Sequence, residues 1–358
     1  ALSYYHALDL YGNVPFVTEE NPIGSYIPTQ TNRADLFNYV ESELLAIDAD
    51  LPAPRANEYG RADKAAAWML LAKLYLNAEV YTGQKKYSEC IAQCNKIISA
   101  GYTLEPNYAH LFLADNNKSK EIIFPVTFDG VRTKTWGGMT YLVHAPIGGS
   151  MNPNDYGVNG GWWGLRTTSG LVSNFSDPSG ATDKRAMFHT DGQRLAIDDI
   201  SAFTDGYGIT KYKNVTSTGA KGSDVEGNFP DNDFPMFRLA DAYLMYAEAV
   251  KRGGTGGSEA TALQYINALR ARAYGNATGN VTSYDLDFVL AERARELYWE
   301  AHRRTDLIRY GKFTGASYLW PWKGGVKAGK AVEDWRVVFP IPINDVVANP
   351  NLKQNTGY

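Results

Sequence analysis

The side chains best suited to recognising a ligand are tryptophans and tyrosines in glycine-rich segments that show neither helical nor strand periodicity. Aromatic residues make up 13% of the 358 residues. A flat aromatic face complements the C–H patches of a sugar ring, whereas amide, carboxylate and guanidinium groups complement its hydroxyls. The segment 136–166 offers both kinds of group, and its candidate contacts are Trp136, Tyr141, Asn154, Tyr156, Trp162, Trp163 and Arg166.

Two pairs of tryptophans differ in spacing, and the spacing predicts where their rings point. Trp162 and Trp163 are adjacent, so an extended backbone would direct them to opposite faces. One ring could then bind ligand while the other anchors the loop, or both could bury the loop against the scaffold. Trp320 and Trp322 are two residues apart and would share one side of an extended segment. They could form a two-ring ligand platform, a hydrophobic plug or a contact with a partner protein.

Carboxylates offer a competing, catalytic interpretation. Glu292, Glu296 and Glu300 follow one face of a helix predicted over 291–313, and paired carboxylates can hydrolyse glycosidic bonds. Arginines lie within helical reach of these acids, so we expect structural ion pairs instead. The expected pairs are Glu300 with Arg304 and Asp306 with Arg309. No G-x-S-x-G string or zinc-ligand spacing occurs, so we expect no catalytic residue, bound metal or cofactor.

Amphipathic helices are predicted to hold these loops. Apolar residues recur at helical spacing in three segments near the N-terminus, 33–49, 61–78 and 86–99. The second segment contains the string W-x2-L-A-x2-Y from Trp68, which matches the first helix of a tetratricopeptide repeat. The third places Cys90 and Cys94 on one face, where we expect buried packing residues and no disulfide.

A second helix pair is predicted far downstream, at 239–246 and 262–269. Tandem repeats of this type recur about every 34 residues, so the wide gap indicates a helical scaffold with one long insertion. The insertion opens with a strand-like run, 121–128, and is too rich in aromatic residues for a disordered segment. The predicted fold is mostly α, with 1–120 and 234–313 as scaffold, 121–233 as the loop-rich, ligand-binding insertion with short strands, and 314–358 as a loop and C-terminal tail.

The charge distribution narrows the possible partners. The net charge is −4, from 35 basic and 39 acidic residues, and no block of Lys or Arg occurs. Nucleic acid and an anionic membrane surface are therefore not expected as partners. The first residues read like the second half of a helix that runs into a turn at Gly12, so we expect that an N-terminal region has been removed.

Seven strings in order carry a resemblance to a known family. They lie at 11–16 (YGNVPF), 61–67 (RADKAAA), 120–124 (KEIIF), 237–249 (FRLADAYLMYAEA), 265–273 (YINALRARA), 292–311 (with ER, EL and R-x-DL-x-R-x-G) and 341–355 (with IP, NPNL and QN). In these strings and their order, the chain resembles the SusD/RagB family of Bacteroidota outer-membrane lipoproteins.

The resemblance implies a cell-surface protein that is not an enzyme. Such a protein captures an oligosaccharide or polysaccharide for uptake through a SusC-like TonB-dependent transporter. The implied fold is a single SusD-like α/α domain over 1–358, without its N-terminal part and lipid anchor, that holds ligand on irregular loops. The alternatives are a peptide-capturing RagB-like importer subunit and a helical-repeat scaffold whose only partner is protein.

Overall fold

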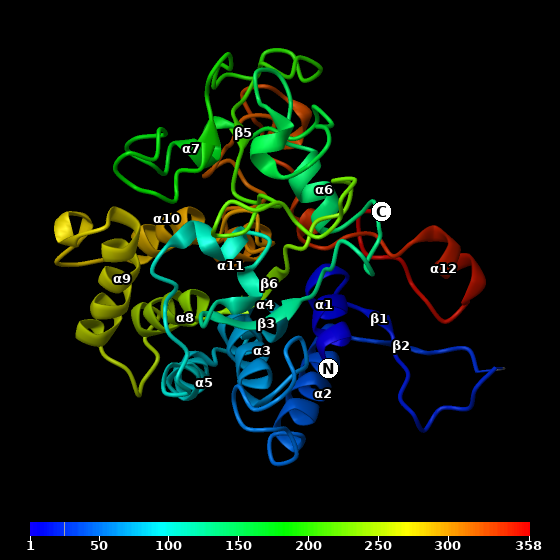
Figure 1. The fold of residues 1–358 in the computed structure, drawn as a ribbon. Helices are drawn as coiled ribbons and strands as arrows, with labels where there is room; N and C mark the ends of the chain where they lie inside the picture. The colour runs from blue at the N-terminus through cyan, green and yellow to red at the C-terminus, as the bar shows by residue number, and fades with distance from the viewer. Residues whose placement is uncertain (25) are drawn as a thin grey trace.

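The chain folds as a mostly helical structure with short strands, as predicted. The computed structural model describes residues 1–24 and 26–358 (Figure 1). The α-helices are α1 (Leu2–Leu10), α2 (Arg33–Ala46), α3 (Lys64–Leu76), α4 (Ala78–Thr82), α5 (Tyr87–Ile98), α6 (Met139–His144), α7 (Ser169–Val172), α8 (Leu239–Lys251), α9 (Glu259–Tyr274), α10 (Leu286–Leu297), α11 (Arg303–Arg309) and α12 (Ile343–Ala348). The strands are β1 (Val14–Pro15), β2 (Gln30–Thr31), β3 (Ile122–Val126), β4 (Phe188–His189), β5 (Gly208–Ile209) and β6 (Phe234–Arg238). Short 3-10 turns are η1 (Tyr108–Phe112), η2 (Asn116–Lys118), η3 (Pro153–Tyr156), η4 (Ala277–Gly279), η5 (Lys323–Gly325) and η6 (Asp334–Val337).

Two helix pairs that are distant in sequence stack side by side. Helix α3 packs on α5, α5 on α8, and α8 on α9 (Figure 1). Cys90 and Cys94 lie in α5, are completely buried and are not bonded to each other, as expected for packing residues. Side-chain caps define where the outer helices begin, since Asp63 accepts from the Ala66 amide and Ser258 from the Thr261 amide. The stacking is consistent with tetratricopeptide-like packing.

A two-stranded sheet joins the parts of the scaffold that precede and follow the long segment 127–233. Strands β3 and β6 pair antiparallel, with Ile122 opposite Arg238 and Val126 opposite Phe234. The segment between them leaves and re-enters the scaffold at this sheet, and Figure 1 shows it in green above the helices. Its residues Ile147, Met151 and Phe203 belong to a hydrophobic cluster that also includes Tyr108 and Phe112 of η1. Residues 127–233 therefore form a packed, loop-rich body.

The prediction of one continuous C-terminal helix is wrong. Helix α10 ends at Leu297, and α11 begins at Arg303. Between them, Trp299 has φ +62° and Ala301 has φ +63°, which lie in the left-handed region that disfavours residues with a Cβ atom. These two residues turn Glu300 into the interior, where it is 3% exposed. The cost of this backbone is offset by the partners that Glu300 meets there.

Those partners belong to a group of buried charges, which we call the buried ion cluster. It comprises Glu121, Asp183, Arg185, Lys211, Arg238, Arg272, Glu292, Glu296 and Glu300. Arg238 is at its centre, with nitrogens 2.8 Å from Glu121, 2.6 Å from Glu296 and 2.6 Å from Glu300. Lys211 lies 2.6 Å from Glu300. The insertion, the β3–β6 sheet and helices α9 and α10 are thus joined by ion pairs.

The helix ion pairs expected from sequence are half right. Asp306 pairs with Arg309 at 2.8 Å, as predicted. Glu300 does not pair with Arg304; the Arg304 guanidinium lies 3.0 Å from Asp9 of α1. Periodicity alone could not show this, because the break between α10 and α11 separates the two side chains that a continuous helix would have paired.

The C-terminal tail packs against the N-terminal hairpin. Amide side chains of Asn349 and Asn351 donate to the carbonyl of Pro28, and Asn355 donates to the carbonyl of Tyr11. Figure 1 shows α12 beside the β1–β2 connection at the edge of the molecule. Among the described residues, no helix combines the length and apolar character that a membrane crossing requires.

Replacing Arg238 by Met should destabilise the fold severely. The substitution leaves the Glu296 and Glu300 carboxylates buried without their shared cation, so we expect a loss of about 3–5 kcal/mol in the free energy of unfolding. Urea unfolding followed by circular dichroism measures this. The matched control is Arg61→Met, because Arg61 pairs with Glu58 at 2.9 Å with both side chains exposed, and a surface pair contributes only about 0–1 kcal/mol. Equal losses in the two variants would contradict a stabilising role for the cluster.

Relieving the backbone strain at Ala301 should stabilise the fold, in contrast to Arg238→Met. Ala301→Gly removes the Cβ atom from a left-handed position, so we expect a gain of roughly 0.5–1 kcal/mol in unfolding free energy. Ala268→Gly, at an exposed position inside α9, should cost about 1 kcal/mol, since glycine weakens a helix interior. Thermal unfolding of both variants tests the prediction, which fails if Ala301→Gly is as destabilising as Ala268→Gly.

Candidate functional site

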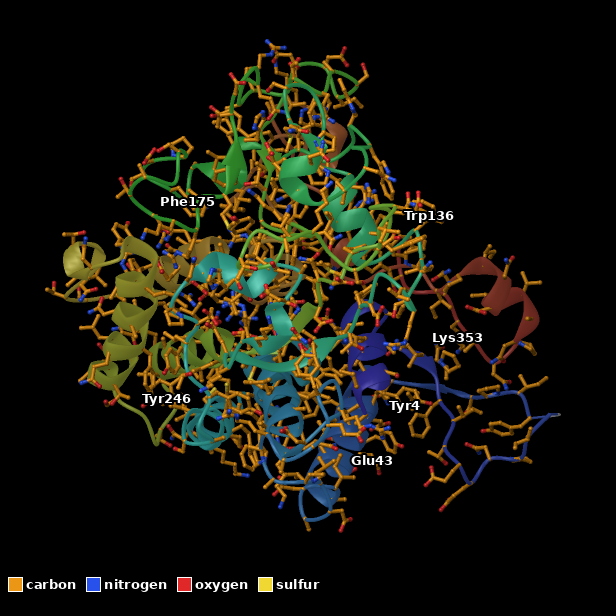
Figure 2. All side chains as sticks on the ribbon, in the orientation of Figure 1. Tyr4, Glu43, Trp136, Phe175, Tyr246 and Lys353 are labelled. Atoms are coloured by element: carbon orange, nitrogen blue, oxygen red, sulfur yellow. The ribbon has the colours of Figure 1, made fainter. Side chains whose placement is uncertain are left out.

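Three predicted aromatic residues come together on the surface of the insertion. Trp136 is 60% exposed, Tyr141 45% and Trp162 40%. The Trp162 ring centroid lies 6.4 Å from that of Trp136 and 6.1 Å from that of Tyr141. Phe229 supports the group from behind, 4.9 Å from Trp136. We call Trp136, Tyr141 and Trp162 the aromatic platform; Figure 2 shows Trp136 at the periphery of the molecule.

A buried histidine lies beneath the platform. The His144 ring stacks on Trp162 at 5.2 Å with an interplanar angle of 20°. Its Nδ1 is 2.8 Å from the carbonyl oxygen of Gly160, and its Nε2 is 2.9 Å from that of Asn228. His144 thus joins three loop segments and fixes the plane of Trp162.

A close backbone approach sets the directions of the two adjacent tryptophans. Any Cβ atom at Gly161 would lie 2.2 Å from the Ile147 carbonyl oxygen, so only glycine fits there. The Trp163 amide donates to this same oxygen at 3.0 Å, and Trp163 has φ +56°. Its ring packs 5.6 Å from Phe203, on different neighbours from those of Trp162. The rings diverge as predicted, but the cause is this turn, since Trp163 is not extended.

Three other predicted contacts support the loops. Arg166 donates to the carbonyls of Gly164, Ile200, Ala202 and Asp205 at 2.8–3.1 Å. Tyr156 is 8% exposed in the hydrophobic cluster of the insertion, which corrects its placement among residues that offer a ring face. Asn154 is exposed and accepts from the Lys221 ammonium at 2.9 Å. We therefore place Arg166 and Tyr156 among the residues that shape the site.

Of the alternatives for the Trp320–Trp322 segment, the structure does not form the two-ring platform. Trp322 has φ +70°, so the backbone is not extended and the alternation of side chains fails. The Trp322 indole donates to the Ile197 carbonyl at 3.1 Å. Trp320 instead contacts Phe313 and Tyr318, with ring centroids 6.1 and 6.0 Å away. The two tryptophans therefore contact different parts of the protein.

The carboxylates of the catalytic alternative are unsuited to glycoside hydrolysis. Glu292 and Glu296 are completely buried, and Glu300 is nearly so. Burial alone would raise the pKa of Glu292, but Arg185, Arg295 and Arg270 outweigh it and lower that pKa to about 2. A glycosidase needs one carboxyl of raised pKa that reaches its substrate, and neither condition is met here. The described part of the chain also contains no group of three or more His, Cys, Asp or Glu placed to hold a metal ion.

The supporting contacts of the platform could not be predicted from the sequence, although Asn159 itself belongs to the segment 136–166 that offers polar partners. Phe229 lies far along the chain from Trp136, in an irregular segment that no periodicity connects to it. Likewise, Asn159 orients this segment by donating to the Glu226 carbonyl at 2.8 Å and to the Asn228 side chain at 2.7 Å. The only sequence signal for these contacts was an excess of asparagine and glycine around Asn159 and Phe229.

The structure is thus a stacked helical scaffold that presents exposed tryptophans on a loop-rich insertion. A sequence profile of the SusD family matches residues 198–358. The starch-binding protein SusD of Bacteroides thetaiotaomicron is 38% identical over an alignment that covers all of this chain and 71% of that protein. The chain belongs to the SusD family.

Other relatives and solved structures agree with this assignment. The SusD-like protein P25 of Formosa agariphila is 26% identical, again over all of this chain and 71% of the relative. Surface glycan-binding protein A from Bacteroides thetaiotaomicron, solved in complex with laminarihexaose, superposes with a TM-score of 0.75 at 24% identity, over 99% of this chain and 76% of that one. The likeness to this structure shows the shared fold.

Removing the Arg166 side chain should loosen the loop that it holds. In Arg166→Ala, the carbonyls of Ile200, Ala202 and Asp205 lose a charged donor, so backbone amides over 198–206 should exchange with deuterium at least several-fold faster. Mass spectrometry of exchange measures this, with α3 as an internal reference. Arg132→Ala is the matched control, because Arg132 is exposed and pairs locally with Asp129. Unchanged exchange over 198–206 would show that Arg166 does not order this loop.

Proposed function

We propose that this protein binds an oligosaccharide or polysaccharide at the cell surface without cleaving it. The observation that carries the proposal is the aromatic platform, where three aromatic side chains that are 40–60% exposed meet on one surface. Exposed aromatic clusters of this kind mark binding sites. The starch-binding relative and the laminarihexaose complex of a structural neighbour support a glycan as the ligand.

The geometry of the platform suits a bent glycan chain. The Trp162 ring is tilted by 45° from that of Trp136 and by 53° from that of Tyr141, so the rings cannot lie against one flat ribbon. Each ring offers a face to the C–H patch of one sugar, and nearby amides such as Asn159 can hydrogen-bond hydroxyls. With few contacts, we expect dissociation constants on the order of micromolar to millimolar.

The proposed physiological role is capture for uptake. In this role, the protein is a lipid-anchored component of the outer membrane that passes its glycan to a SusC-like TonB-dependent transporter. Family membership supports this role, and its anchor and transporter contacts are proposals. Co-purification of the full-length protein with a SusC-like transporter tests it.

Calorimetric titration against hexasaccharides tests the glycan site. We expect maltohexaose or laminarihexaose, which coil, to bind more tightly than the flat cellohexaose. Trp136→Ala and Trp162→Ala should each weaken the best ligand by roughly 5–30-fold, because each loses a stacking face of about 1–2 kcal/mol. Trp162→Phe should retain part of the affinity.

Trp335→Ala is the matched control. Trp335 packs against Tyr358 in the C-terminal segment and belongs neither to the aromatic platform nor to the Trp320–Trp322 segment. If the platform variants bind as well as the control, the platform is not the site. Failure of every glycan to bind, with retained transporter or peptide binding, would favour the protein-scaffold or peptide-capture alternatives. Release of reducing sugar by the purified protein would contradict a non-catalytic role.

A further inference from the structure

A separate cavity lies beside Trp320, between the scaffold and the C-terminal segment. Its volume is about 310 Å³, it is open to solvent on one side, and it is lined by residues of α7, α10, α11 and the segment 313–320. Its buried lining combines apolar side chains such as Leu297 and Leu307 with the polar residues Arg293, His302 and Asp306, and partly exposed aromatic residues complete it. The main apolar surfaces come from Leu171, Leu297, Leu307, Phe313, Tyr318 and Trp320. No residue of the aromatic platform lines it.

The wall that carries Trp320 is fixed in position by a buried lysine. Lys323 is 2% exposed, and its ammonium donates to the carbonyls of Gly315 and Tyr318 at 2.8 and 2.9 Å. The same ammonium lies 4.6 Å from the centroid of the Trp320 ring. The cavity therefore has a preorganised aromatic wall, which reduces the entropy lost when a ligand binds.

The polar groups around the cavity are largely engaged already. The Asn174 amide nitrogen donates to the carbonyls of Gly170 and Leu171, and the Tyr298 hydroxyl donates to that of Arg185. The Thr168 hydroxyl accepts from the Gly170 amide. A sugar would bring many hydroxyls to a space with few free partners, and each unsatisfied group costs free energy. The walls suit an apolar ring.

One charge at the cavity lacks a counter-ion. Arg303 donates to the Leu290 carbonyl at 3.0 Å and to the Tyr318 hydroxyl at 2.9 Å. No carboxylate of the described residues lies within ion-pair distance of its guanidinium, whereas the lining residues Arg293 and Arg304 are both paired with aspartates. A guanidinium of this kind favours an anionic group that can accept its remaining N–H donors.

We infer that this cavity is a second ligand site, which takes a small compound with one or two apolar rings and a single anionic group. The rings would lie between Trp320 and the leucines of the floor, and the anion would meet Arg303 at the rim. This site is independent of the glycan proposal, because it differs in its residues and in the chemistry that it recognises.

Displacement of a fluorescent probe tests the inference. The probe is 8-anilinonaphthalene-1-sulfonate, which combines aromatic rings with one anion, and the competitors are 3-phenylpropanoate and its neutral amide. We expect one probe per chain, and the acid should compete at least tenfold better than the amide. Arg303→Gln should remove this preference, Arg303→Lys should restore part of it, and Trp320→Ala should weaken both competitors several-fold. Arg61→Gln, at an exposed arginine, is the control and should match the unmodified chain.

The inference is overturned if the acid and the amide compete equally in the unmodified chain. It is also overturned if Arg303→Gln leaves the preference intact, or if the probe does not bind. Circular dichroism of each variant checks that the fold is retained, and Arg303→Lys separates a loss of charge from a loss of packing. A glycan titration is not a readout of this site, so its outcome and that of the probe experiment are distinguishable.

Discussion

The buried ion cluster is the interaction on which the rest of the structure depends. Its charges come from the insertion, from the sheet at the neck of the insertion and from helices that a hydrophobic core alone could pack in several ways. Burying charges is expensive, and it is tolerated only when each one meets a partner of opposite sign in good geometry. Arg238 meets that requirement with three carboxylates at 2.6–2.8 Å. The insertion is held to the scaffold by directional pairs of this kind, from Arg185 to Glu292 and from Lys211 to Glu300.

The cluster also explains the strained junction between α10 and α11. A continuous helix would carry Glu300 onward along the helix surface, and the Lys211 ammonium of the insertion would then be buried without its carboxylate partner. Left-handed conformations at Trp299 and Ala301 cost on the order of 1–3 kcal/mol each, and leaving a buried ion unpaired costs about 3–5 kcal/mol, so the ion pairs of Glu300 offset a strain of the same order. Local helix propensity therefore yields to tertiary electrostatics at this junction.

The sequence could predict elements that depend on local patterns, but not those that depend on charges far apart in the sequence. Helices α3, α5, α8 and α9 follow from apolar periodicity, and β3 follows from a run of apolar residues that begins beside the scaffold. The break after Leu297 did not follow, because its cause is the cations at Lys211 and Arg238, which lie far away in sequence. In the site, exposed tryptophans could be predicted from composition. Two features of the site could not be predicted: that Trp136 lies beside Trp162 and Phe229, and that Arg166 binds loop carbonyls. Both depend on the path of an irregular backbone, which has no sequence periodicity.

The division between scaffold and loops has a consequence for how ligand specificity can change. In the aromatic platform, Tyr141 lies in α6, and Trp136 and Trp162 lie in loops. None of these residues belongs to the buried ion cluster. By contrast, the cavity beside Trp320 shares its lining with the ion pairs of Arg293 and Asp306, so its shape is tied to scaffold stability. These exposed rings can therefore be replaced at little cost in folding free energy. The cavity can change mainly at its rim, where Phe313, Tyr318 and Trp320 belong to a loop.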